Sequence, residues 1–171
     1  YKFIKSKFVG RMILAILQAR VSSKRLPGKV LKPILGKPML LHQIKRIQRS
    51  KLIDKLIVAT SESPSDDAIE KICQDNNIDL FRGNLENVLD RFIQCAKKYN
   101  PKHIVRLTGD CPLIDWQVID KTIQYHISGK YDYVNNRIKP AFPDGLDVEV
   151  ISYSSLKIAS NNAVLNSDKE H

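Results

Sequence analysis

One short segment holds most of the residues with evident chemical potential: LQARVSSKRLPGK, at positions 17–29. It contains four cations within ten residues, namely Arg20, Lys24, Arg25 and Lys29. Like charges at this spacing repel one another unless an anion neutralises them. Arginine binds phosphate through two parallel donors, and lysine adds a mobile point charge. The segment therefore predicts a site for a phosphorylated ligand such as a triphosphate; a solvated basic loop is the alternative.

The residues around these cations fit the same purpose. An apolar run at 13–17, ILAIL, predicts a buried strand that leads into Gln18. Backbone N–H groups beyond such a strand point towards a ligand, and Gly28 allows the backbone to approach it closely. The segment matches neither G-x-x-x-x-G-K-[ST] nor G-x-G-x-x-G, so it is neither a P-loop nor a dinucleotide fingerprint.

A carboxylate stands at the end of a second predicted strand. The stretch HIVRLTGD, at 103–110, places Asp110 directly after Gly109. A carboxylate there suits Mg²⁺, which takes oxygen ligands and shares its shell with phosphates and water. Asp115 either supports such a metal site or caps the helix that begins at Trp116. No second ligand lies at metal-binding spacing from any of three histidines, which we interpret as structural: His42, His103 and His126.

Further polar residues lie in or beside other predicted strands. Asp144, Asp147 and Glu149 lie close together in PDGLDVEV, where alternation with Val148 and Val150 puts the last two carboxylates on one side of a strand. They could bind acceptor hydroxyls or a second metal, or form a polar hairpin turn at Asp144-Gly145. Three residues at other strand ends are candidates for a base or ribose pocket, with structural roles as the alternative: Thr60, Ser61 and Arg82.

The elements that must position these residues alternate between strand-like and helical patterns. Strands are predicted at 13–17, 55–60, 78–83, 103–110, 131–136 and 147–151, and helices at 39–47, 65–74, 87–99, 116–126 and from 152. Ser65 is expected to be the N-cap of the second helix. This order predicts an α/β fold with a mostly parallel sheet between two helical layers. Ligands of such folds bind beyond the carboxyl ends of the strands, where the candidate residues lie.

The composition of the chain indicates which class of protein it belongs to. The chain has 171 residues, 43% hydrophobic and 27% charged, as expected for a single globular domain. No apolar run approaches about 18 residues, so no membrane span is expected. Three widely spaced cysteines argue against a disulfide framework and favour a cytoplasmic protein. We expect residues 1–11 to be a leader or tail and residues 12–171 to form the domain. The net charge of +10 permits anionic partners, but no nucleic-acid-binding motif accompanies it.

The motifs resemble those of one enzyme family. ARVSSKRLPGK, at 19–29, fits the A-R-x-x-S-x-R-L-P-G-K signature of cytidylyltransferases that activate sialic acid-like and octulosonate sugars, and GKPML follows at 36–40. RLTGDCPLID at 106–115, FRGNLENVLDRF at 81–92 and DGLDVEV at 144–150 resemble the subgroup of spore coat polysaccharide biosynthesis protein F. The resemblance implies a Rossmann-like three-layer α/β/α nucleotidyltransferase fold. It also implies Mg²⁺-dependent transfer of CMP from CTP to a sugar for surface polysaccharide, with release of pyrophosphate.

The resemblance assigns roles to particular residues. It implies catalytic charge stabilisation by Arg20, Arg25 and Lys29, and a metal-binding Asp110. The implied nucleotide-binding set is Gln18, Ala19, Arg20, Ser23, Arg25, Gly28, Lys29, Thr60, Arg82 and Gly109, and the implied acceptor set is Asp144, Asp147 and Glu149. A homodimer is compatible with it. Because family members continue beyond the point where this chain ends in SDKEH, we expect a C-terminally incomplete domain.

Two other functions compete with this interpretation. A glycosyltransferase could use the same sheet, but an Asp-x-Asp pair is expected after a strand, and TGDCP has a lone aspartate. A non-catalytic anion or nucleic-acid binder would bind oligonucleotides with a steep salt dependence and would release no pyrophosphate.

Overall fold

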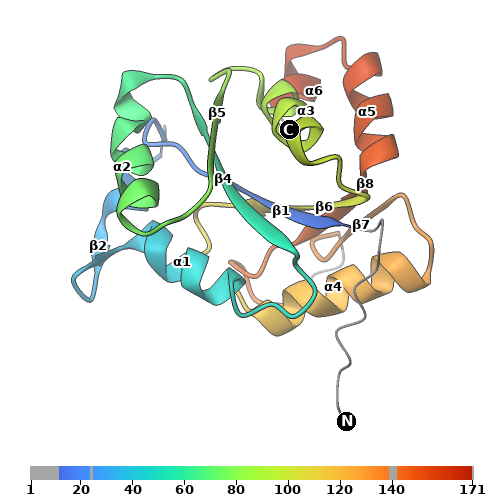
Figure 1. Ribbon diagram of the computed structural model, residues 1–171, viewed down its shortest axis with the longest axis horizontal. Coiled ribbons are helices and arrows are strands. Elements are labelled where there is room, and N and C mark those ends of the chain that lie inside the picture. Colours follow the sequence, from blue (N-terminus) through green and yellow to red (C-terminus); the bar gives the residue numbers. More distant parts are fainter. Residues whose placement is uncertain (1–11, 24, 139–141, 171) are drawn as a thin grey trace.

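The computed structural model describes residues 12–23, 25–138 and 142–170, and its centre is a six-stranded sheet (Figure 1). In spatial order the strands are β5 (Leu80–Gly83), β4 (Lys55–Ser61), β1 (Ile13–Gln18), β6 (His103–Thr108), β8 (Glu149–Ser152) and β7 (Tyr133–Asn135). β1 is parallel to β4 and β6, and β5 is parallel to β4, whereas β8 is antiparallel to both neighbours. The prediction of a mostly parallel sheet is confirmed.

Helices cover both faces of this sheet. One face packs against α1 (Met39–Ile47), α2 (Asp67–Asp75) and α4 (Trp116–Ser128), and the other against α3 (Val88–Tyr99) and α5 (Tyr153–Asn162). The short α6 (Asn166–Glu170) lies against α3. Two 3₁₀ turns, η1 (Lys29–Leu31) and η2 (Pro64–Asp66), and a small hairpin of β2 (Pro33–Ile34) and β3 (Lys37–Pro38) complete the described elements. The result is the predicted three-layer arrangement.

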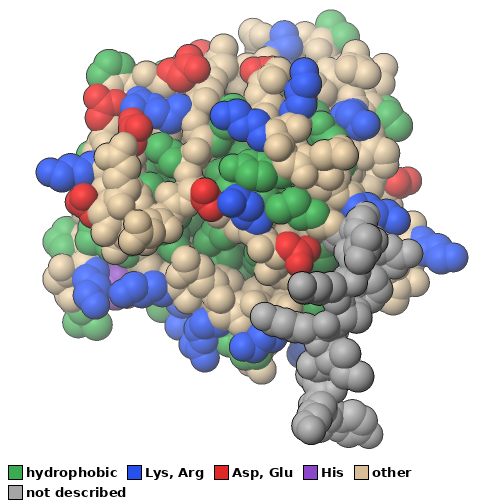
Figure 2. All heavy atoms as spheres, viewed as in Figure 1, with side chains coloured by type: hydrophobic (Ala, Val, Ile, Leu, Met, Phe, Trp, Pro, Cys, Tyr) green, Lys and Arg blue, Asp and Glu red, His purple; other side chains and the backbone are tan. Residues whose placement is uncertain are grey.

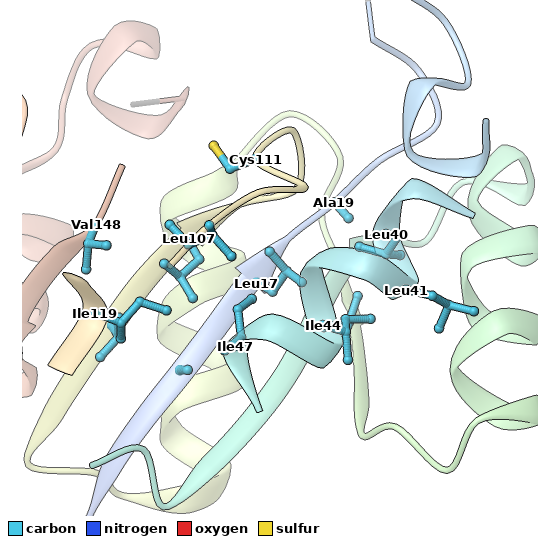
Figure 3. Close-up of a cluster of buried hydrophobic side chains, with 14 of the residues drawn as sticks. Leu17, Ala19, Leu40, Leu41, Ile44, Ile47, Leu107, Cys111, Ile119 and Val148 are labelled. Atoms are coloured by element: carbon cyan, nitrogen blue, oxygen red, sulfur yellow. The ribbon is translucent and has the colours of Figure 1, made fainter. Parts of the chain in front are cut away.

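The central strand explains why the first apolar run is continuous. Ala15 and Leu17 belong to the core under α1 and α4, which Figure 3 shows, whereas Leu14 and Ile16 belong to the core under α3. All four are fully buried. A strand covered on both faces has no side left for polar residues, so its sequence shows no alternation.

The helix caps and the start of one strand differ in part from the predicted ones. The prediction of Ser65 as a helix cap is wrong: the Ser63 side chain accepts the hydrogen bond of the Ser65 N–H and begins η2 ahead of α2. Asp115 is a helix cap, because its side chain accepts a 2.8 Å hydrogen bond from the Gln117 N–H. The strand predicted at 147–151 begins at Glu149, so Asp147 lies in the preceding loop.

The surface of the protein is charged, and its cysteines are buried. Lysines and arginines are scattered over the face drawn in Figure 2, interspersed with acidic residues. None of the described helices has the length and apolar character needed to cross a membrane. The three cysteines, Cys73, Cys95 and Cys111, are buried free thiols. The predicted leader at 1–11 lies outside the described residues.

Candidate nucleotide-binding site

A cavity of about 570 Å³ opens at the carboxyl ends of β1 and β6. Its walls are formed by the ends of β1 and β6, the loops that follow them, the first residue of α3, residues between β7 and β8, and the last residue of α6. Its lining residues are Gln18, Ala19, Arg20, Ser23, Arg25, Lys29, Val30, Val88, Arg106, Thr108, Gly109, Asp110, Arg137, Asp147 and Glu170. The fold therefore brings most of the predicted phosphate-binding residues and the predicted metal ligand to one place.

Lys29 and Asp110 meet in this cavity although they are 81 residues apart in the chain. The Lys29 ammonium donates a 2.9 Å hydrogen bond to Asp110 Oδ2. Gly28 makes the turn that aims Lys29, because its φ of 68° lies in the left-handed region that favours glycine. Burial opposes ionisation of Asp110. Hydrogen bonds from Lys29 and Thr108 and the charge of Lys29 outweigh it, and hold the pKa of this carboxyl below its ordinary value.

The neighbouring thiol of Cys111 donates a weak hydrogen bond to the same carboxylate, with 3.8 Å between Sγ and Asp110 Oδ1. Cys111 is buried directly after Asp110, and its burial, with the charges of Asp110 and Asp147, raises the pKa of the thiol despite a hydrogen bond with Thr108. A protonated, buried cysteine is a poor nucleophile.

A buried aspartate, Asp66, fixes the start of the basic loop. Its Oδ1 accepts a 2.7 Å hydrogen bond from the Val21 N–H, and its Oδ2 accepts bonds from the N–H and the hydroxyl of Ser61. Asp66 has no exposed surface. One carboxylate thus joins the loop after β1 to the end of β4. This role of Asp66 was not predicted, because SPSDD indicated only the start of a helix.

Gly109 keeps the two strand ends in contact. Its N–H donates a 2.7 Å hydrogen bond to the Gln18 carbonyl oxygen. A Cβ at this position would lie 2.9 Å from that oxygen and 3.0 Å from the Cβ of Ala19. Only glycine therefore fits the gap, and this contact places Asp110 beside the basic loop.

Two further arginines enter the cavity without having been predicted. Arg106, on β6, forms a 2.7 Å ion pair with Glu149, which also accepts a 2.9 Å hydrogen bond from the Tyr133 hydroxyl. Burial, together with the charge and hydrogen bond of Glu149, raises the pKa of Tyr133 to about 12. Arg137 lies 3.3 Å from Asp147. Arg106 lies within a predicted strand. The sequence did not specify which face of the sheet its side chain would occupy, because that depends on packing.

The structure separates the predicted acceptor residues. Asp147 lines the cavity, whereas Glu149 lies behind Arg106 and is paired with it. Asp144 is exposed and lies outside the lining, next to Gly145, whose φ is 88°.

The three candidates for the base or ribose pocket, Thr60, Ser61 and Arg82, also lie outside the lining. Thr60 is fully buried within β4. Arg82 is held by Asp67 at 2.8 Å and Glu70 at 2.5 Å, and it donates to the carbonyl oxygens of Ser61 and Ser63. Through these bonds the Arg82 side chain connects β5 with the start of α2.

The donor set of the cavity fits a magnesium ion that is shared with phosphates. Within the described part of the chain no group of three or more His, Cys, Asp or Glu side chains could hold a metal alone. Asp110 and Asp147 nevertheless both line the cavity. One or two carboxylates completed by substrate phosphates and water are the usual protein environment of Mg²⁺.

A doubly covered, mostly parallel sheet with a cation-rich cavity at its carboxyl edge is the architecture of α/β proteins that bind ligands beyond their strand ends. The family model described as Cytidylyltransferase matches residues 14–170. The chain belongs to this cytidylyltransferase family, as the motifs implied.

Individual relatives agree with the family. The spore coat polysaccharide biosynthesis protein SpsF of Bacillus subtilis is 41% identical over 125 residues, which are 71% of this chain and 52% of that protein. A 3-deoxy-manno-octulosonate cytidylyltransferase of Geobacter sulfurreducens is 34% identical over 111 residues, 65% of this chain and 44% of that enzyme. The chain thus spans about half the length of these curated relatives.

A solved structure extends the likeness to three dimensions. A cytidylyltransferase from Leptospira borgpetersenii superposes with a TM-score of 0.90 at 33% identity, covering 94% of this chain and 68% of that one. The fold predicted from the motifs is thereby confirmed.

Proposed function

We propose that this chain carries the nucleotide site of an enzyme that transfers CMP from CTP to a sugar and releases pyrophosphate. The observation that carries the proposal is the Lys29–Asp110 pair, set in a cavity that Arg20, Arg25 and Arg106 also line. A cavity with this cation content suits a triphosphate, and a carboxylate within it suits the accompanying metal. Family membership and the name of the Geobacter relative favour CTP and a sugar acid.

The reaction needs positioning and charge neutralisation rather than a covalent nucleophile. A hydroxyl oxygen of the sugar bonds to the α-phosphorus of CTP, the bond from that phosphorus to the bridging oxygen of pyrophosphate breaks, and the hydroxyl proton passes to water. Arg20, Arg25 and Lys29 bind the β- and γ-phosphates and stabilise the charge that develops on the leaving pyrophosphate. When it binds the phosphates, Lys29 replaces its hydrogen bond to Asp110 with one to a phosphate oxygen.

Asp110, with Asp147 nearby, would hold Mg²⁺ against the phosphates. The metal supplies charge neutralisation at the phosphate oxygens when it is bound. Before the metal binds, the hydrogen bonds from Lys29 and Thr108 and the charge of Lys29 hold the pKa of Asp110 low and keep its carboxylate ionised.

Asp147 and Arg137 line the cavity and are proposed to face the sugar. Arg106, held in place by Glu149, could bind a carboxylate of the sugar. Glu149 thereby acts through Arg106 rather than on the substrate.

The test is a pyrophosphate-release assay on the full chain, in which four nucleoside triphosphates are crossed with a panel of neutral and acidic sugars, with and without Mg²⁺. We expect release only with CTP, a particular sugar and the metal. Release that is independent of any sugar, or tight binding of oligonucleotides without release, would count against the proposal.

A further inference from the structure

Positive charge is distributed unevenly along the chain. Half of the 28 Lys and Arg residues, but none of the 18 Asp and Glu residues, lie within residues 1–53, and the first acidic residue is Asp54. In the fold, six of these cations lie on the β2–β3 hairpin and its base, on α1 and in the turn after it. No carboxylate of the described residues forms an ion pair with any of the six, so their charge is available to an anionic partner. They are Lys32, Lys37, Lys45, Arg46, Arg49 and Lys51.

The hairpin carries at its tip a leucine that its own turn does not favour. Leu35 is 92% exposed, and its φ of 47° lies in the left-handed region, followed by Gly36 at 75°. L-residues with a Cβ are disfavoured there, and two-residue hairpin turns of this kind prefer Asn or Asp before the glycine. Leu35 therefore costs backbone energy while its apolar side chain stays in water. A partner that takes up this side chain would account for both features.

The hairpin is a preformed protrusion. His42, on α1, donates a 2.7 Å hydrogen bond from Nε2 to the Ile34 carbonyl oxygen and so fixes the hairpin to the helix. Pro33 and Pro38 face each other across the two strands. Proline has no N–H to offer a further strand, so the hairpin is poorly suited to extend the sheet of another protein. Its exposed tip is instead suited to insert a side chain.

α1 continues the positive charge away from the hairpin. Lys45 and Arg46 follow His42 by one helical turn, and Arg49 follows Arg46 by another three residues. Arg46 Nε donates a 2.7 Å hydrogen bond to the Ile114 carbonyl oxygen. This bond brings a second exposed apolar side chain close to α1, because the residue before Ile114 is Leu113, which is 72% exposed.

An aromatic ring lies at the far end of the same surface. Arg49 and Lys51 are placed over the half-buried Trp116 ring, 5.9 Å and 5.7 Å from its centre. Figure 2 shows Lys, Arg and hydrophobic side chains side by side at its lower left, over the hairpin and α1. We call the six cations, with Leu35, Leu113 and Trp116, the basic face.

We propose that the basic face docks on an anionic lipid surface, with Leu35 inserted between the headgroups. Anionic headgroups attract each cation held close to them, and an apolar side chain that enters the interface adds a hydrophobic anchor. Either signal alone gives marginal attachment, whereas the two together hold a protein at the surface reversibly. A nucleic acid would use the cations but would leave the aliphatic tip exposed. The observations therefore favour lipid.

Docking in this orientation leaves the nucleotide cavity open. Among the described residues, neither the hairpin nor α1 contributes to the cavity lining. α1 covers one face of the sheet, whereas Val88, which lines the cavity, belongs to the core on the other face. The inference goes beyond the proposed transfer of CMP and does not depend on it, since attachment to lipid needs no nucleotide.

The experiment is a flotation assay of the full chain with two kinds of vesicle, one of phosphatidylcholine alone and one of phosphatidylcholine and phosphatidylglycerol in equal parts. We expect binding to the anionic vesicles only, and release at about 1 M salt, where the screening length falls to about 3 Å. Trp116 is the one tryptophan of the chain, so its emission should shift to shorter wavelength on binding. Absence of binding to the anionic vesicles, or equal binding to both kinds, would overturn the inference.

Two variants test the parts of the basic face. Leu35→Asn removes the apolar tip but suits the left-handed turn, so it should melt at the same or a higher temperature and bind anionic vesicles about fivefold more weakly or worse. The double variant Lys45→Gln/Arg49→Gln should weaken binding about tenfold or more, because each cation close to an anionic surface contributes about fivefold. Unchanged binding by Leu35→Asn would refute the insertion of the tip.

Matched controls carry the same substitutions elsewhere. Leu165→Asn replaces another exposed leucine, which is 64% exposed between α5 and α6. Lys97→Gln/Lys98→Gln removes two exposed cations from α3, on the opposite side of the sheet. Both should bind vesicles as the wild type does; losses equal to those of the basic-face variants would indicate adsorption by net charge and overturn the inference. A mixed-sequence oligonucleotide that binds through Lys45 and Arg49, without any binding to vesicles, would assign the face to nucleic acid instead.

Discussion

Replacement of Asp66 by alanine tests how the basic loop is held. The carboxylate accepts hydrogen bonds from two backbone N–H groups, those of Val21 and Ser61, and from the Ser61 hydroxyl. All of these donors would remain in or near a buried site without an acceptor. At about 1–3 kcal/mol for each unsatisfied buried donor, and with some relaxation, we expect a loss of about 3–5 kcal/mol in the free energy of unfolding. That is a large part of the roughly 5–15 kcal/mol that stabilises a typical domain.

Urea unfolding measures this loss, and calorimetry with CTP measures its consequence, which should be weaker binding because the loop leaves the end of β4. Asp67→Ala is the matched control. Asp67 is the next residue, but its carboxylate is 65% exposed and pairs with Arg82 near the surface, so its loss should cost less than about 1 kcal/mol. Equal effects of the two substitutions, or an Asp66→Ala variant that loses less than about 1 kcal/mol, would refute the anchoring role.

Three other predictions concern the site and the core. Lys29→Met should weaken CTP binding by about 1.5–3 kcal/mol, the range for a hydrogen bond to a charged group, and unchanged calorimetric affinity would contradict its phosphate role. Asp110→Asn should keep the melting temperature but lose Mg²⁺-dependent pyrophosphate release, because an amide is a neutral and weaker ligand; wild-type turnover would make Asp110 merely structural. Burial lowers the pKa of His126 below its ordinary value of 6.5, despite the charge of Asp132, and His103 contacts it at 3.1 Å. The unfolded chain therefore binds the proton more readily, so the free energy of unfolding should be greatest above about pH 6.5 and fall as the pH decreases. Urea titrations from pH 5 to 8 should show this slope in the wild type and a shallower one in His126→Leu; an identical slope would assign the effect elsewhere.

Local patterns in the sequence were sufficient to predict the fold and the edge of the sheet at which the candidate cations and Asp110 lie. The unbroken run at 13–17 could only be a strand covered on both faces, and ARVSSKRLPGK had to follow it. Asp110 was predictable for the same reason, because parallel strands end at one edge of the sheet. Lys29 and Asp110 were therefore both expected at this edge, and the structure adds their direct 2.9 Å contact.

Tertiary structure decided which polar side chains can still form bonds with a ligand and which are already paired within the protein. Arg82 and Glu149 were candidates by position, yet Arg82 is held by Asp67 and Glu70, and Glu149 is held by Arg106 and Tyr133. Arg91 was not predicted from the sequence, although FRGNLENVLDRF places it directly before Phe92 on α3. Packing against Gly83, with no ion pair to a carboxylate of the described residues, left two of its nitrogens, Nε and Nη2, without hydrogen-bond partners.

The distinction has a physical basis. Strand direction and burial depend on hydrophobic periodicity, which neighbouring residues determine. Whether a guanidinium or carboxylate meets a partner depends on contacts between residues far apart in the chain, such as Asp66 with Val21, 45 residues away. Such contacts form only when the sheet and its helices come together. The sequence by itself therefore indicated the edge of the sheet where the candidate site lies, and the assembled fold determined which side chains there remain available to a ligand.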